Sequence, residues 1–140
     1  MIAIICVDDN LGMMFNNRRQ SQDRILRKRI LEISSNSRIL MNSYSIKQFD
    51  EEDKDKIITD EDFAKNAQKG DLVFFENISP KEYENNIEKI ILYHWNRNYP
   101  ADFYFDINLK ESGWILNDSY DFEGYSHEKI TEEIYVKWKF

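Results

Sequence analysis

The sequence predicts an α/β domain with a mixed sheet flanked by helices and a C-terminal antiparallel hairpin. Apolar, strand-like runs alternate with helical patterns over most of the chain, and two runs with period-2 alternation follow near the C-terminus. At 140 residues, with 41% hydrophobic and 14% aromatic residues, the chain suffices for one domain with one core. We therefore expect a single domain over residues 1–140.

The chain opens with a strand, a polar loop and a helix. Residues 2–7 are apolar and β-branched, which is typical of a buried strand, and the segment that follows, 14–22, is polar and basic. Apolar residues at helical spacing then predict a helix over 21–34. Ser21 is its expected N-cap, and Asp23 lies in its first turn, where a negative charge complements the helix dipole.

Short elements are predicted in the middle of the chain. The apolar runs 38–41 and 72–75 indicate strands, and the dense charge run 50–56 indicates an exposed loop. The remaining expectations are a short helix through Phe49, a brief strand over 57–59, and a helix over 60–68 with Thr59 as N-cap.

The segment after Ser79-Pro80 has two interpretations. Serine followed by proline is typical of a helix start, and periodicity alone would extend that helix to His94. The alternative ends the helix near Glu88 and makes 90–95 a strand, and the periodicity favours neither.

The C-terminal part is predicted to be β-structure. Residues 101–107 are aromatic and alternating, which indicates a strand. The closing hairpin rests on two alternating sets joined by a long connection over 123–127: Trp114, Leu116, Tyr120 and Phe122, then Ile130, Ile134, Val136 and Trp138.

Charge and cysteine content exclude several classes of function. The net charge of −7 argues against nucleic acid as the primary partner, because phosphate binding needs clustered basic residues. Cys6 is the only cysteine, so no intrachain disulfide forms, and we expect it to be a small core residue. No signal peptide and no membrane span of roughly 18 apolar residues is visible, so we expect a cytoplasmic protein.

The order of motifs resembles dihydrofolate reductase along nearly the whole chain. Val7-Asp8 and Gly12-Met13, followed by Asp23, match the family's first strand, flexible loop and acid-bearing helix. Residues 38–45 stand in the place of the family's strand that ends in Met-Gly-Arg-x-Thr. Residues 72–75 and the helix with Tyr83 resemble its later strand and tyrosine-bearing helix. The resemblance implies a dihydrofolate-reductase-like mixed sheet.

Two departures from the family pattern argue against the family's cofactor. Its Gly-Arg-x-Thr motif holds cofactor phosphate at a helix start, whereas this chain has Asn42-Ser43-Tyr44-Ser45, without the glycine or the arginine. Its glycine pair is replaced by Glu76-Asn77, and the charge of Glu76 would repel a pyrophosphate. We expect no NADPH binding and no other cofactor.

The substrate side of the resemblance is better preserved. It implies that the carboxylate of Asp23 makes a two-point, charge-assisted hydrogen bond to a pterin-like ligand, which makes Asp23 the candidate catalytic residue. The other expected ligand-binding residues are Phe15, Arg18, Arg19, Asn42 and Tyr83. An acid in the first turn of a helix also has an ordinary structural explanation.

Metal and nucleophile chemistry have little support in the sequence. The two histidines, His94 and His127, have no metal-ligand spacing, and no Gly-x-Ser-x-Gly elbow is present. The run 14–21 is similar to small bacterial proteins sometimes labelled ribonuclease Z. That activity requires a histidine-rich zinc motif that this chain lacks, so we expect no metal site.

Two function hypotheses follow. The first is a dihydrofolate-reductase-like protein that does not bind NADPH but keeps a pocket for a pterin- or nucleotide-like small molecule. The second is an acidic protein-binding module, such as an immunity or antitoxin-type inhibitor of a basic nuclease. A deep cleft beside Asp23 favours the first, whereas a filled cleft and exposed aromatic residues favour the second.

Overall fold

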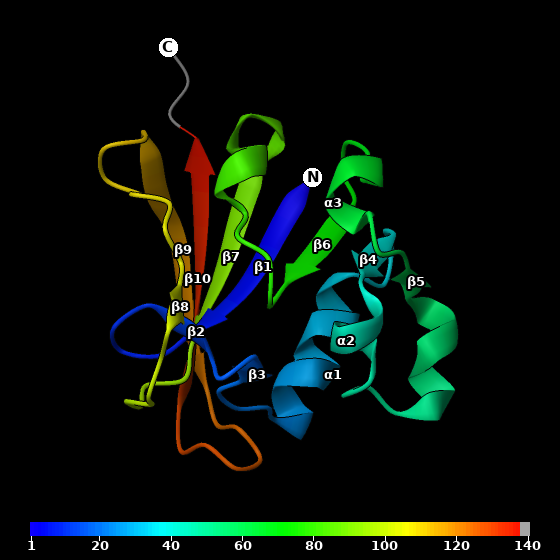
Figure 1. The fold of residues 1–140 in the computed structure, drawn as a ribbon, viewed down its shortest axis with the longest axis horizontal. Coiled ribbons are helices and arrows are strands. Elements are labelled where there is room, and N and C mark those ends of the chain that lie inside the picture. Colours follow the sequence, from blue (N-terminus) through cyan, green and yellow to red (C-terminus); the bar gives the residue numbers. More distant parts are fainter. Residues whose placement is uncertain (138–140) are drawn as a thin grey trace.

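The computed structural model describes residues 1–137, and its main feature is a seven-stranded mixed sheet (Figure 1). The strand order is β5-β4-β6-β1-β7-β10-β9. The first five strands in this order are parallel, and β10 and β9 are antiparallel additions to β7. The bounds of these strands, in chain order, are β1 Ile2–Val7, β4 Ile39–Met41, β5 Ile58–Thr59, β6 Leu72–Phe75, β7 Lys89–His94, β9 Trp114–Phe122 and β10 Ile130–Lys137.

A second, smaller sheet and five helical segments complete the domain. The small sheet has the order β3-β2-β8, formed by β2 Gly12–Phe15, β3 Arg18–Arg19 and β8 Phe103–Tyr104. The helical segments are α1 Arg24–Ile33, α2 Ser43–Ile46, α3 Phe63–Asn66 and the 3₁₀ helices η1 Glu51–Lys56 and η2 Lys81–Asn86.

The core has two halves, one on each face of the large sheet. Alternate residues of β1 point to opposite faces, so Ala3, Ile5 and Val7 enter one half and Ile4 enters the other. The half around Ile4 packs against Leu26 and Ile30 of α1. The other half packs against the small sheet, α3 and η2. The prediction of a mixed sheet flanked by helices is confirmed.

The loop predicted over 14–22 is largely a β-hairpin. Asn16 and Asn17, with φ of 55° and 60°, form the two-residue turn between β2 and β3. Asparagine tolerates this left-handed conformation, and such turns match the twist of paired strands. The helix start also differs from the prediction, because Asp23 itself is the N-cap of α1 and Ser21 precedes the helix.

Three predicted segments change type or length. The charge run predicted as a loop forms η1, where Lys54–Glu51 and Lys56–Asp53 ion pairs join residues three apart, which lie directly above one another in a 3₁₀ helix. The helix predicted over 60–68 shortens to α3, because Asp60 accepts hydrogen bonds from the Asp62 backbone and the Asn66 amide. The strand predicted over 101–107 shortens to β8.

For the segment after Ser79-Pro80, the structure agrees with the second interpretation, a short helix followed by a strand. The helix ends early, as η2, and β7 begins at Lys89 and pairs with β1 over six positions. The C-terminal hairpin is confirmed as β9 and β10, while its predicted member Trp138 lies outside the described residues.

Candidate functional site

The parallel strands end together at one edge of the sheet, and a small cavity lies between the ends of β6, β1 and β7. The connections from β1 and β6 leave in opposite directions there, to β4 and β7, and open α/β sheets bind ligands at such points. The cavity has a volume of about 10 Å³ and is lined by Cys6, Met13, Arg19, Gln20, Ser21, Phe75, Glu76 and Trp95. This volume leaves no room for a pterin or a nicotinamide ring.

Arg19 closes this cavity from the β2–β3 hairpin. Its guanidinium donates to both carboxylate oxygens of Glu76, over 3.1 and 3.2 Å. It also lies over the ring of Tyr44, 4.4 Å from the centroid, and its backbone N–H donates to the Tyr44 hydroxyl over 2.7 Å. Gln48 donates a third hydrogen bond to Glu76. The predicted ligand residue Arg19 therefore lies at the expected edge, with its charge engaged inside the protein.

At the start of α2, a carboxylate from another segment already accepts from a backbone donor group. At the start of α2, Asn42 caps the helix by accepting from the Ser45 N–H over 3.0 Å, and the backbone N–H of Ser43 donates to Glu61 over 2.9 Å. The Ser43 hydroxyl also donates to Glu61, and these two hydrogen bonds lower the pKa of Glu61. An internal carboxylate thus occupies a helix N-terminal N–H group of the kind that can bind a phosphate.

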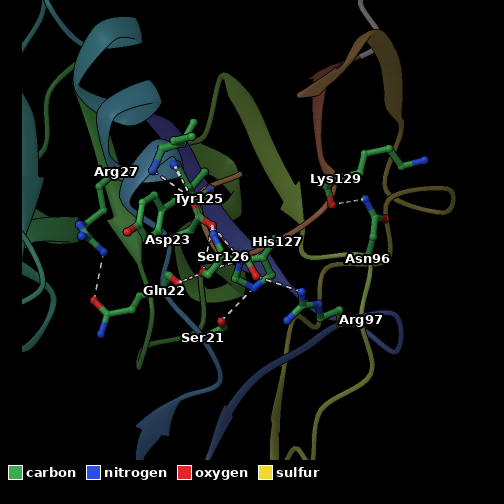
Figure 2. A network of polar contacts seen from close by, with 12 residues as sticks. Ser21, Gln22, Asp23, Arg27, Asn96, Arg97, Tyr125, Ser126, His127 and Lys129 are labelled. Carbon is green, nitrogen blue, oxygen red and sulfur yellow. Dashed lines mark hydrogen bonds and ion pairs between the residues drawn. The ribbon is translucent and has the colours of Figure 1, made fainter. Parts of the chain in front are cut away.

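Asp23 lies in a buried network at the start of α1, drawn in Figure 2. Its carboxylate accepts from the backbone N–H groups of Ile25 and Leu26 in its own helix. It also accepts from the N–H groups of Tyr125 and Ser126 in the β9–β10 connection, over 3.0 and 2.9 Å. The Asp23 carboxylate therefore links the β9–β10 connection to the start of α1 through hydrogen bonds.

The protonation of Asp23 follows from this network. Burial alone would raise its pKa, but hydrogen bonds from Tyr125, His127, Ser126 and Leu26 outweigh burial and hold the pKa far below the ordinary value of 3.8. The carboxylate stays ionised, and its hydrogen-bond partners all come from the chain itself. A role of Asp23 in binding a pterin-like ligand stays a prediction.

His127 is the functional candidate that sequence reasoning missed. Its ring is 3% exposed and stacks on Trp95, with centroids 4.5 Å apart and planes at 25°. The Nδ1 atom lies 2.8 Å from Asp23 Oδ2, and Nε2 lies 3.0 Å from Ser21 Oγ. The Tyr99 hydroxyl lies 3.2 Å from the same Nε2. The separation of more than 100 positions between Ser21 and His127 left no sequence signal for this contact.

The other predicted site residues do not converge on the cavity. Phe15 is 43% exposed on the β2–β3 hairpin, and Arg18, its partner in the hairpin, is also exposed. Tyr83 of η2 packs against Phe75, with ring centroids 6.3 Å apart. Asn42 reaches toward the edge, where it donates to Asn77 over 2.8 Å.

A groove of about 760 Å³ is lined by residues of α1 and of the segment around η1, and Figure 1 shows α1 in blue. The charged residues that line it from α1 are mostly basic and those at η1 are mostly acidic, and Leu31 and Phe49 also line it. The polar residues that line it are Arg24, Arg27, Lys28, Glu32, Ser34, Ser35, Ser37, Asp50, Glu52, Asp53 and Lys56. Its volume lies within the usual range of small-molecule sites.

Residues 1–137 lack two further features. That part of the chain contains no group of three or more His, Cys, Asp or Glu residues arranged to hold a metal ion. It also contains no helix with the length and apolar character that a membrane crossing requires.

The comparisons with known proteins identify the fold. Neither a protein-family model nor a curated protein sequence matches the chain. Among solved structures, the chain is similar to dihydrofolate reductase from Enterococcus faecalis complexed with NADP(H) and RAB-propyl, with a TM-score of 0.69 and 11% sequence identity. The match covers 99% of this chain and 96% of that chain. The chain therefore has a dihydrofolate-reductase-like α/β fold.

Proposed function

We propose that this protein binds a small molecule in the groove between α1 and η1 and does not catalyse NADPH-dependent reduction. The observation that carries the proposal is the groove itself, with a volume of about 760 Å³ and walls of opposite charge. The cavity at the strand ends, by contrast, is closed by Arg19 and Glu76.

The basic wall supports recognition of an anion. Within the described residues, no carboxylate lies within ion-pair distance of Arg24, Arg27 or Lys28. Arg24 lies over the ring of Tyr125, and Arg27 donates to the neutral amide of Gln22 over 3.1 Å. Three positive charges outside any described ion pair favour a phosphate or carboxylate group.

The opposite wall and the floor support a heterocycle. Asp50 and Glu52 accept hydrogen bonds only, so they suit the amino and imino groups of a planar base. Phe49, which also lines the groove, is 4% exposed and is held by an edge-to-face contact with Phe74, so it offers a fixed apolar surface. An amino-bearing heterocycle with an anionic tail matches all three surfaces, which is the chemistry of pterin- and nucleotide-like ligands.

Thermal-shift and calorimetric titrations with folic acid, guanosine monophosphate and NADPH test this proposal. We expect folic acid or guanosine monophosphate to raise the melting temperature, because a ligand that binds only the folded state stabilises it. The variant Arg27→Glu should weaken that binding by tenfold or more. Lys65→Glu, a matched charge reversal at an exposed lysine of α3, should leave the affinity unchanged.

Two outcomes would overturn the proposal. One is no change in melting temperature with either folic acid or guanosine monophosphate. The other is oxidation of NADPH in the presence of dihydrofolate at an ordinary enzymatic rate.

A second candidate function rests on the edge strand β9. Residues 115–121 are exposed, and Leu116 and Tyr120 are 48% and 51% exposed at the end of the strand order. An exposed edge strand can pair with an added strand from a partner. The nearby acids Asp118 and Asp121 favour a basic partner, as an immunity or antitoxin-type inhibitor of a nuclease would need.

Affinity capture from the native host tests the second candidate. We expect wild-type protein to retain one basic protein in equimolar amount and to inhibit its nuclease activity, and Leu116→Asp to do neither. Retention of no such protein, or equal retention by Leu116→Asp, would rule out the β9 edge as its docking site.

A further inference from the structure

Ser21, His127 and Asp23 form a continuous hydrogen-bonded chain beside the cavity at the strand ends (Figure 2). The Ser21 hydroxyl lies 3.0 Å from Nε2 of His127, and the Asp23 carboxylate lies 2.8 Å from Nδ1 on the opposite side of the ring. A hydroxyl, an imidazole and a carboxylate in this order are the parts of an activated nucleophile. This feature is independent of the groove between α1 and η1.

The surroundings of His127 select one tautomer. A carboxylate can only accept hydrogen bonds, so the Nδ1 atom that faces ionised Asp23 carries the proton and donates it. The Nε2 atom then has a free electron pair directed at Ser21. Stacking on Trp95 and near-complete burial hold the ring in this orientation. The imidazole is therefore arranged as a general base for the Ser21 hydroxyl.

Donors for a developing oxyanion are available next to Ser21. The backbone N–H groups of Gln22 and Asp23 donate to no acceptor within the described part of the chain. In enzymes with a nucleophilic serine, the N–H of the residue after the serine commonly stabilises the oxyanion. Gln22 is that residue here, and it is exposed.

We propose that Ser21 is a nucleophile that accepts the acyl group of small carboxylic esters, with His127 as general base and Asp23 as the residue that positions it. The cavity on the inner side of Ser21, of about 10 Å³, has no space for an acyl chain. The ester therefore approaches from solvent, to which Ser21 is partly exposed. These limits favour acetyl-sized acyl groups.

The reaction balances with water as the only co-reactant. Ser21 Oγ forms a bond to the ester carbonyl carbon while its proton passes to Nε2 of His127. The bond from that carbon to the alcohol oxygen then breaks, and the leaving alcohol takes the proton from Nε2. Water hydrolyses the acyl-serine by the same proton transfers, which releases the carboxylic acid and restores the Ser21 hydroxyl.

Labelling with a fluorophosphonate probe, located by peptide mass mapping, and hydrolysis of p-nitrophenyl acetate together test the proposal. We expect one label per chain, on Ser21, and ester hydrolysis above the rate of a heat-unfolded sample. Ser21→Ala should abolish both. Ser119→Ala, which removes an exposed hydroxyl from β9, should change neither.

The variant His127→Gln should lower both rates by about 100-fold, the usual scale for loss of a general base. Because His127 is buried, circular dichroism must first confirm that this variant is folded. The comparison of the wild type with Ser21→Ala tests the proposal even if His127→Gln does not fold. Absence of labelling, a label on another residue, or hydrolysis that persists in Ser21→Ala would each overturn the proposal.

Discussion

Arg19 and Glu76 form a two-point ion pair, with donor–acceptor distances of 3.1 and 3.2 Å, across the cavity between the ends of β1 and β6. This contact fills the place where open α/β sheets commonly bind their ligands. In this dihydrofolate-reductase-like fold, a side chain from the β2–β3 hairpin therefore closes the cavity at the strand ends.

Removal of Arg19 should destabilise the protein. The side chain of Glu76 is 9% exposed, so Arg19→Met leaves a nearly buried carboxylate with only Gln48 as a donor. We expect a loss of about 2 kcal/mol in the free energy of unfolding, below the usual value for buried pairs because the Arg19 side chain is itself 19% exposed. Urea unfolding measures this change.

The neighbouring residue supplies the control for this prediction. Arg18→Met removes an exposed arginine from the same hairpin and should change the stability by less than about 0.5 kcal/mol. The double variant Arg19→Met/Glu76→Gln should recover part of the loss, because it removes the stranded charge. Equal stabilities of Arg19→Met and Arg18→Met would contradict this account.

Tyr93→Phe should cost more stability than the same change at Tyr135. Tyr93 is fully buried and donates to Glu132 over 2.8 Å, and Glu132 also accepts two hydrogen bonds from Arg29. Tyr135 is only partly buried and donates to Glu133 over 3.0 Å. Hydrogen bonds to charged groups contribute about 1.5–3 kcal/mol when buried, so we expect a loss of about 2 kcal/mol at Tyr93. Thermal unfolding of the two variants should rank them in this order, and a reversed order would disprove the explanation.

Asp23 should make the free energy of unfolding depend on pH in the acid range. Its pKa is lower in the folded protein than in the unfolded chain, where it is near 3.8. The stabilisation is therefore fully present above about pH 4 and declines as pH falls further, by up to about 1.4 kcal/mol per pH unit. Asp23→Asn removes this contribution, so the wild type should lose stability more steeply than the variant between pH 5 and pH 2, a window set by this depressed pKa. Parallel slopes in urea titrations would show that Asp23 does not contribute in this way.

Gly124→Ala should disturb the hydrogen-bond network of Asp23 from the β9–β10 connection. A Cβ at this position would lie 2.7 Å from Asp23 Oδ2 and 3.0 Å from the His127 carbonyl oxygen. We expect a loss of about 2 kcal/mol, since overpacking in a closed site usually costs 1–3 kcal/mol. In an Asp23→Ala background the same substitution should cost less, because one of the close contacts is gone. A double-mutant cycle measures this coupling, and strict additivity would argue against it.

The sequence predicted the large sheet better than the site. Most strands of that sheet follow from a local apolar or alternating run, as in β1 and the β9–β10 hairpin, whereas the pattern over β7 left helix and strand open. The contacts at the site join residues far apart in the chain, such as Arg19 with Glu76 and Ser21 with His127. Only the tertiary fold brings these pairs together. The ligand-binding role of Asp23 stays a prediction, and its neighbours in the β9–β10 connection, and so its internal hydrogen bonds, could not be foreseen.

Tyr99 should restrain the reactivity of Ser21. Its hydroxyl lies 3.2 Å from Nε2 of His127, and Ser21 Oγ lies 3.0 Å from the same atom. Because Nε2 has one electron pair, only one of the two hydroxyls can donate to it at a time. Tyr99→Phe removes the competing donor, so we expect the fluorophosphonate probe to label Ser21 about twofold faster than in the wild type, on the assumption that the two hydroxyls share Nε2 roughly equally. Tyr104→Phe, a control whose hydroxyl donates to the Ala101 carbonyl instead, should label at the wild-type rate. Slower labelling in Tyr99→Phe than in this control would mean that Tyr99 assists Ser21 rather than competing with it.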